Sequence, residues 1–222
     1  MTTTTHWSTV FAFVALAGTA TAQEVTRMPE PTRQAIGIDV GLEDAWITRA
    51  SYTHRLNLGF VPDARVFGRF TLPVVAPDLG DFGIDGGMRA TPLAWRDFRL
   101  ALLVGPIVRH ASNELFTATG IGVGATVLLG YEGPHWGLSG EGGYEQTFAT
   151  YLSHSDRYRN TVYAGAKDGW YAVTGSIARA GLRGGARFGP VEIALRAGLN
   201  ATGQLHALNP PFYVTLGGAF AF

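Results

Sequence analysis

Apolar residues alternate strictly with small or polar residues along most of the chain. The C-terminal segment is the clearest case, with Phe212, Val214 and Leu216 on one face of an extended chain and Tyr213 and Thr215 on the other. A period of two residues is typical of a β-strand with two chemically different faces. Because the same period recurs from Ile36 onward, the sequence predicts an all-β fold.

Ten segments share this pattern, and turn residues separate them. They cover residues 36–43, 46–58, 65–72, 82–91, 98–109, 120–131, 136–148, 178–188, 191–200 and 212–222. Pro106 is expected to weaken the far end of the fifth segment, since proline cannot donate to a strand ladder. An even number of strands lets a sheet close into an antiparallel barrel with both termini at one end. Ten strands are predicted, with eight or twelve as alternatives.

The N-terminal residues are expected to lie outside the barrel. Residues 10–18 are apolar, and Ala20 and Ala22 follow them with the small-residue spacing of a secretory cleavage site. We therefore predict a signal peptide over residues 1–22, although its first residues lack the usual Lys or Arg. Residues 23–34 contain Pro29 and Pro31 and are expected to form an extended periplasmic linker, which leaves residues 35–222 for the barrel.

The C-terminal strand ends on an aromatic residue, Phe222, with Phe220 two residues before it. In this it resembles the last strand of bacterial outer-membrane β-barrels, whose assembly machinery reads a C-terminal aromatic. The resemblance implies a closed transmembrane β-barrel in the outer membrane, with Phe220 and Phe222 as an assembly signal. It also implies the barrel-assembly machinery, membrane lipid and lipopolysaccharide as partners. It is generic and indicates no subfamily.

Composition narrows the class of protein further. The formal net charge is zero, which argues against nucleic acid as a partner, and the chain contains no Cys. Lys167 is the only Lys, and Trp46, Trp95 and Trp136 fall near predicted strand ends. These features favour an apolar face toward lipid over a soluble barrel with an apolar interior. We expect a monomer without a cofactor, and the sequence has no metal-ligand spacing.

The polar face of the predicted strands carries charges of both signs. Charges inside a narrow barrel are costly unless they are paired, so a network of Arg and carboxylate groups is expected along the lumen. It is predicted from Asp39, Arg49, Arg69, Asp85, Arg89, Glu141, Glu145, Arg183, Arg187, Glu192 and Arg196, with Arg65 and Arg99 on the same face. Such a network either holds a narrow barrel together or lines a path for small solutes.

One short motif resembles an enzyme. His110-Ala111-Ser112-Asn113 is similar to the His-x-Ser-Asn stretch of outer-membrane lipid A deacylases, which implies a hydroxyl nucleophile at Ser112 and a base at His110. An acidic partner is also needed. Glu114 is adjacent, but Gly124 stands about a dozen residues on, where the family has its acid. A polar loop explains these residues as well, so the favoured interpretation is a structural or surface-interaction barrel or a very small channel.

The segment over residues 151–171 is the longest predicted loop. Arg157, Arg159 and Lys167 lie there among Tyr158, Tyr163, Trp170 and Tyr171. Basic and aromatic side chains at the outer rim are suited to lipopolysaccharide phosphates or to a partner protein. An ordinary surface loop is the alternative.

Overall fold

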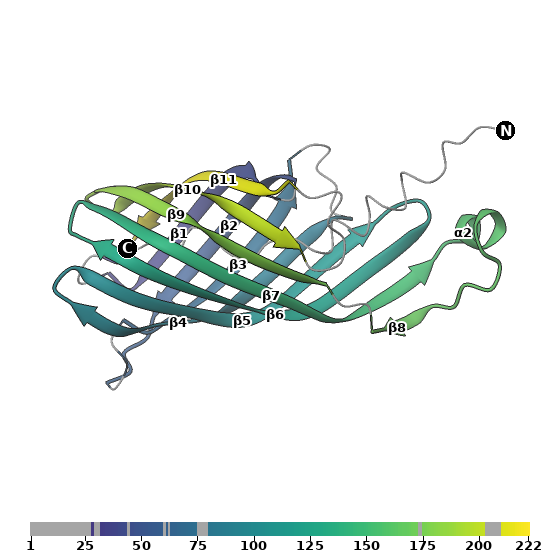
Figure 1. Ribbon diagram of the computed structural model, residues 1–222, viewed down its shortest axis with the longest axis horizontal. Coiled ribbons are helices and arrows are strands. Elements are labelled where there is room, and N and C mark those ends of the chain that lie inside the picture. The colour runs from purple at the N-terminus through teal and green to yellow at the C-terminus, as the bar shows by residue number, and fades with distance from the viewer. Residues whose placement is uncertain are drawn as a thin grey trace.

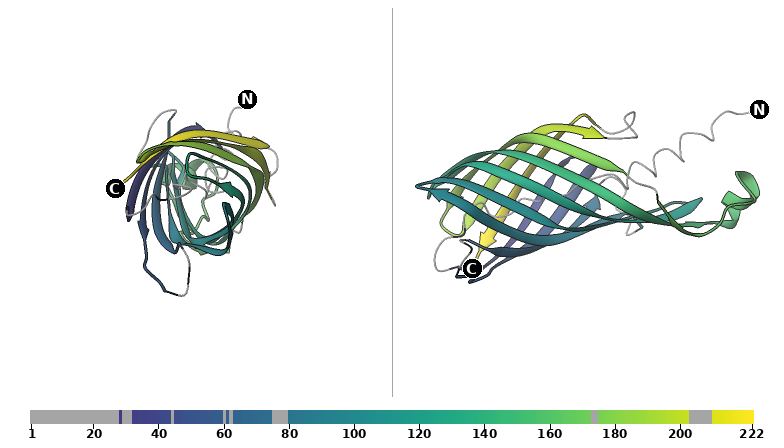
Figure 2. Two further views of the ribbon diagram at one scale, coloured as in Figure 1. Left: turned by 90° about the vertical axis from the view of Figure 1, so that its left-hand side faces the viewer. Right: turned by 60° about the horizontal axis from the view of Figure 1, so that its bottom comes forward.

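The computed structural model describes residues 28, 32–43, 45–59, 61, 63–74, 80–172, 175–202 and 210–222. Ten strands of this chain form a barrel, seen from the side in Figure 1 and end-on in Figure 2. They are β1 (Gln34–Leu42), β2 (Trp46–Arg55), β3 (Arg65–Pro73), β4 (Phe82–Trp95), β5 (Phe98–Ser112), β6 (Phe116–Glu132), β7 (Trp136–His154), β9 (Ser176–Phe188), β10 (Val191–Thr202) and β11 (Phe212–Ala221).

Each barrel strand pairs antiparallel with its neighbours, and β1 closes the sheet against β11 from Ala35↔Ala221 to Leu42↔Val214. Closure gives every strand two partners, which is what a sheet needs where lipid offers no hydrogen bonds. The prediction of a closed antiparallel ten-stranded barrel is confirmed, and eight or twelve strands do not fit the described residues. Among those residues, no helix is long and apolar enough to cross a membrane.

The two ends of the barrel differ. We call the end that holds Gln34 and Phe222 the proximal end and the opposite end the distal end. Proximal connections include the tight turns at 96–97 and 189–190, whereas the distal connection between β7 and β9 spans residues 155–175. The predicted signal peptide lies outside the described residues. Of the predicted linker, Met28 is buried among Ala35, Ala219 and Ala221 at the proximal mouth.

A projection beyond the distal rim is formed by residues 147–172, which we call the flap. It contains the last residues of β7, the short helix α2 (Asp156–Thr161) and strand β8 (Gly169–Tyr171), which pairs with β7 outside the barrel. Figure 1 shows α2 and β8 at the right, away from the barrel wall. Phe116, Ala118 and Leu152 form a small core there, against which Tyr158 of α2 packs.

Several strands extend further than the sequence pattern predicts, among them β4, which runs to Trp95, and β6, which starts at Phe116. β7 continues past Phe148 to His154, because a bulge opposite Ile121 and Gly122 shifts the alternation by one residue. β5 continues past Pro106 to Ser112, so the far end of the strand is not lost, although its ladder with β4 has no pairs at Gly105 and Pro106. The ladder between β4 and β5 is interrupted from Asp85↔Ile107 to Met88↔Val104, where Gly86, Gly87 and Gly105 let the two backbones approach, and its register shifts again between Ala90 and Leu93.

The two faces of the wall are chemically opposite. Large apolar side chains on the outer face are exposed, such as Ile38 at 61%, Leu182 at 62% and Leu195 at 50%. The alternate positions point inward and are buried, and many of them are charged. An apolar exterior around a polar interior is the arrangement of a barrel that crosses a membrane.

Candidate functional site

The interior of the barrel is filled with ion pairs. All eleven residues of the predicted lumen network lie on the inward face, and ten of them are buried. Arg187 is the least enclosed, with a side chain 11% exposed at the proximal end. The structure divides these charges into three groups.

The first group, the Glu43 cluster, consists of Asp39, Glu43, Arg49, Glu141, Arg196 and Tyr213. Arg49 on β2 donates to Glu43 at 2.8 and 3.2 Å and to Asp39 at 3.2 Å. Arg196 on β10 contacts Glu43 at 3.5 Å and binds Glu141 on β7 at 2.7 and 3.0 Å. These contacts connect β1 and β2, on one side of the β1–β11 junction, to β10 and β7 on the other side.

Tyr213 on β11 completes that cluster. Its hydroxyl donates to Glu141, and its side chain is fully buried. An added Cβ at Gly198 of β10 would stand 2.4 Å from the backbone oxygen of Ala180 on β9 and 2.6 Å from Tyr213 Cζ. Glycine is required at this position because the β9 backbone and the aromatic ring together occupy the space of a side chain.

The second group, the Asp85 cluster, runs through Arg69, Asp85, Arg109, Glu145 and Arg179. Arg69 binds Asp85 and stacks on Phe67, with its guanidinium carbon 4.4 Å from the ring centroid. Arg109 lies 3.9 Å from Asp85 and 3.7 Å from Glu145, which also binds Arg179. The contact between Arg109 on β5 and Glu145 on β7 passes over the intervening strand β6.

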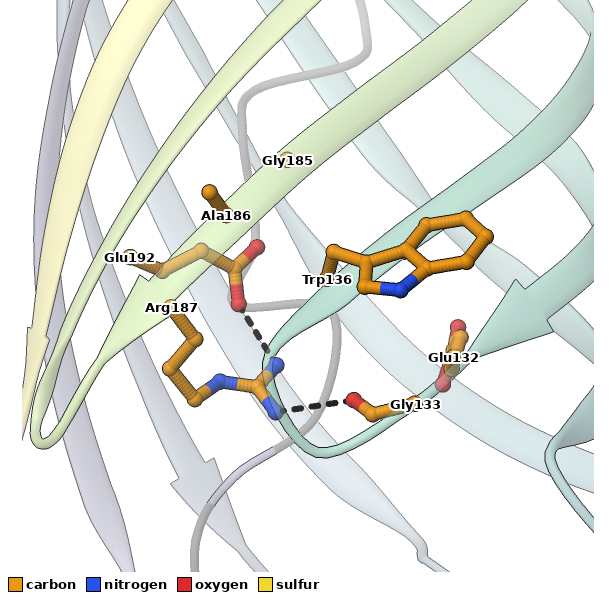
Figure 3. A pocket seen from close by; sticks show the side chains of 8 residues that line it. Glu132, Gly133, Trp136, Gly185, Ala186, Arg187 and Glu192 are labelled. Carbon is orange, nitrogen blue, oxygen red and sulfur yellow. Dashed lines mark hydrogen bonds and ion pairs between the residues drawn. The ribbon is translucent and has the colours of Figure 1, made fainter.

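The third group lies near the proximal end. Glu132 contacts Arg89 at 3.1 Å and Arg99 at 3.5 Å. Glu192 contacts Arg187 at 2.8 Å and Arg183 at 3.6 Å. Figure 3 shows Arg187 reaching Glu192 and the carbonyl of Gly133, so one side chain connects the β6–β7 and β9–β10 turns.

Cavities beside these groups are very small. The pocket of Figure 3, between Trp136, Arg187 and Glu192, contains no space as large as a water molecule. A second cavity, between Arg69, Pro106 and Thr126, has about 10 Å³, the volume of roughly one water. At these two places the side chains fill the barrel interior.

Several interior residues lie outside the network that the sequence predicts. Glu43 is the last residue of its predicted segment and Glu132 directly follows its segment, whereas Asp63 falls in a connection, where it pairs with Arg65. Arg109, Arg179 and Tyr213 lie on the predicted polar face, and that position was the available signal for them. The excess of interior Arg over predicted acids was a second signal, because each buried Arg needs a carboxylate.

The His110 motif lies on the outer face of the barrel near its distal end. His110 stacks on Phe82, and its Nδ1 lies 2.9 Å from Oγ1 of Thr119 on β6. The backbone N–H of Ser112 donates to Asp81, and the Asn113 side chain accepts from Leu115 and Phe116 at the turn. Glu114 binds Arg157 of α2, so the adjacent acid points to the flap.

Aromatic rings mark both edges of the exposed apolar surface. At the proximal end Trp95, Phe98, Tyr131 and Trp136 form a continuous series, with successive ring centroids 6.5, 6.0 and 4.5 Å apart. Toward the distal end Phe70 and Phe82 lie 6.1 Å apart. From Phe98 to His110 along β5 is roughly 40 Å of strand, or about 30 Å of height at the usual tilt, enough to cross a bilayer core.

No family model and no curated protein sequence matches this chain. Among solved structures, it is similar to an outer membrane channel from Pseudomonas putida F1, with a TM-score of 0.54 and 9% identity over 91% of this chain and 100% of that one. It is also similar to the outer membrane protease OmpT from Escherichia coli, with a TM-score of 0.49 and 10% identity over 86% and 94%. For a KdgM porin the TM-score is 0.41, with 8% identity over 85% and 99%.

At this level of identity the likeness concerns the fold and not the activity. The similarity to the channel from Pseudomonas putida F1 agrees with the closed sheet, the exposed apolar wall and the charged interior described above. The chain has the fold of a bacterial outer-membrane β-barrel.

Proposed function

We propose that this chain is an integral outer-membrane protein whose barrel is a rigid support for its distal surface and not an open pore. The observation that carries the proposal is the Glu43 cluster, which joins β1, β2, β7, β10 and β11 through the lumen. A charged lining that serves permeation leaves water between its side chains, whereas these groups bind one another directly. The proximal end then faces the periplasm and the distal end faces outward.

Conductance tests this proposal directly. The purified protein, refolded in lipid, should give no regular current steps in planar bilayers. Resistance to carbonate extraction and different gel mobilities before and after boiling would show that it had inserted and folded. Regular ion-selective steps from inserted protein would contradict a closed support and favour a small channel.

Assembly is proposed to depend on the C-terminal aromatics. Phe220 and Phe222 lie on the outer face, 44% and 51% exposed, where another protein can reach them. Replacing Phe222 by Ser should lower the amount of protein in the outer membrane, while Phe212→Ser at the distal end of the same strand should lower it less. Equal loss in both variants would argue against a C-terminal signal.

A second candidate function is hydrolysis of a lipid ester by His110 and Ser112. It is favoured by their position, since both lie on the outer face near the distal edge of the apolar surface. Thr119 also orients His110 through Nδ1, which leaves Nε2 directed away from that contact. In hydrolases this orienting group is usually an acid, and here it is a hydroxyl.

Mass spectrometry of lipid A after expression distinguishes this candidate from the first. A non-enzymatic barrel leaves the ester-linked acyl chains intact. Loss of one such chain, abolished by Ser112→Ala and by His110→Ala, would establish the esterase. The variant Ser153→Ala is a control, because Ser153 lies on the same sheet in the flap.

A further inference from the structure

One row of paired residues runs across the outer face from the barrel into the flap. Phe82 pairs with His110, His110 with Thr119, Thr119 with Tyr151, and Tyr151 with Trp170. Paired residues point to the same side of a sheet. The ring centroids of Tyr151 and Trp170 lie 5.5 Å apart, nearly edge to face. Trp170 therefore belongs to the outer surface although β8 lies outside the barrel.

Such rows climb toward the distal end, because the strands are tilted. The row that starts proximally at Trp95 on β4 ends distally at Leu72 on β3, through Phe98, Tyr131, Leu138, Gly184, Leu195, Leu216, Val40 and Thr48. With strands about 4.8 Å apart and tilted by roughly 40°, each step rises by about 3 Å. Trp170, four strands from Phe82, stands about 12 Å further out.

This height places Tyr151 and Trp170 beyond the apolar surface. Phe82 stands near the distal edge of that surface, and the next row outward from His110 is Ser112, Thr117 and Ser153, which carries hydroxyls only. Tyr151 is 39% exposed and Trp170 is 60% exposed. The opposite face of the flap carries the small apolar core that contains Phe116, Ala118 and Leu152, and Tyr158 of α2 covers it. The outward face thus combines two exposed aromatic rings with hydroxyl groups.

The basic residues of the flap are already paired with acids. Arg157 binds Glu114, and Arg159 lies 2.8 Å from Asp168 and 3.5 Å from Asp156. Only Lys167 has no ion-pair partner among the described residues of this region. The charge is therefore nearly balanced, which disfavours the phosphate binding that the sequence suggested.

We propose that the outward face of the flap, centred on Tyr151 and Trp170, binds the saccharide part of an outer-leaflet glycolipid. The inference rests on the proposed outer-membrane location. The C–H face of a sugar ring stacks on an aromatic ring, and its hydroxyls exchange hydrogen bonds with Ser and Thr side chains. The outward face of the flap begins where the apolar surface of the barrel ends. The sugars of a neighbouring glycolipid therefore lie at the same height as this face.

Fluorescence of single-tryptophan proteins tests this inference. One protein keeps Trp170 and a second keeps Trp136, with the other four tryptophans replaced by Phe. Each is reconstituted in phosphatidylcholine, in lipopolysaccharide with a complete core, and in lipopolysaccharide with a truncated core. Acrylamide should quench Trp170 several-fold less with the complete core than with either other lipid. Trp136, in the proximal aromatic series, should be shielded equally in all three.

The outcomes separate the two proposals. Equal quenching of Trp170 in all lipids, with Trp136 shielded, would overturn the saccharide site and leave the membrane barrel intact. Shielding of Trp170 already in phosphatidylcholine would also overturn it, because the contact would then be with lipid. Exposure of Trp136 in every lipid would contradict the membrane location itself.

A second measurement does not depend on the tryptophan replacements. With the complete core, trypsin should cleave the flap slowly, and Trp170→Ser should restore rapid cleavage. Tyr163→Ser is the matched control, since Tyr163 is 62% exposed in the flap but lies outside its sheet. Equal protection of the Trp170→Ser variant and the parent would count against the site.

Discussion

Arg196 on β10 binds Glu141 on β7 through Nε and Nη2, at 3.0 and 2.7 Å, past the intervening strand β9. The two-point contact fixes the separation of strands that do not pair with each other. Because Arg196 also contacts Glu43, the same guanidinium connects the distal β1–β2 turn to the opposite wall. The interior ion pairs therefore hold strands that do not pair with each other at a fixed separation.

Removing Arg196 should be severely destabilising. Arg196→Leu leaves the Glu141 carboxylate buried without its guanidinium partner, bound by the Tyr213 hydroxyl, and breaking a buried pair from one side costs about 3–5 kcal/mol. Urea unfolding of the refolded protein measures this loss. Arg157→Leu is the control, because its pair with Glu114 is exposed and should contribute less than about 1 kcal/mol. Equal effects would mean that interior pairs do not stabilise the barrel.

The assignment of the outer face predicts a dependence on depth. Leu195 and Leu199 point outward from β10, 50% and 67% exposed, with Leu199 four residues nearer the distal end. Leu195→Arg should cost about 2–4 kcal/mol near the membrane midplane, and Leu199→Arg should cost less. Equilibrium unfolding in vesicles compares them. A smaller effect at Leu195 than at Leu199 would mean that the membrane lies elsewhere on the barrel.

Packing of Tyr213 on glycine can be tested in the same way. Gly198→Ala would bring a methyl group against the Ala180 backbone oxygen and the Tyr213 ring, and overpacking of this kind costs about 1–3 kcal/mol. Gly142 faces outward and has open space around its Cβ position, so Gly142→Ala should be close to neutral. Comparable unfolding free energies for the two variants would show that the β9 backbone and the ring both move aside freely.

Sequence periodicity was sufficient to predict the fold because the two faces of each strand differ in chemistry. Residues 191–200 and 212–222 alternate without interruption, and both are strands with the predicted faces. Periodicity failed to predict the strand where a bulge shifts the alternation of inward and outward residues. The bulge beside Ile121 moves the inward positions of β7 by one residue, so the pattern seemed to stop at Phe148.

The interior partners were harder to predict for a different reason. Alternation says that Arg196 points inward but not which acid it meets, since the partner Glu141 is 55 residues away. Glu43 and Glu132 lie at strand ends, where a side chain can turn either into the lumen or into water. Tilt and closure decide these contacts, and they are properties of the whole barrel. The shared outer row of His110, Thr119 and Trp170 depends on register for the same reason.

The last prediction concerns the acid sensitivity of the flap. The backbone N–H of His154 donates to Asp168, and this bond, with the side chains of His154 and Arg159, lowers the pKa of Asp168 below its ordinary value of 3.8. A carboxyl with a lowered folded-state pKa contributes its full stabilisation above the ordinary value and loses it as the pH falls through the folded value. The contact between Asp168 and the end of β7 should therefore persist at neutral pH and weaken below about pH 4.

Site-directed spin labelling can measure this loosening, because the chain has no Cys of its own. A label at Tyr163→Cys, between α2 and β8, should be ordered from pH 5 to 7 and become more mobile as the pH falls below about 4. Adding Asp168→Asn should make the label mobile at every pH and remove this dependence. A label at Gly142→Cys on the barrel wall is the reference. If mobility at position 163 follows pH equally with and without Asp168, another group controls the flap.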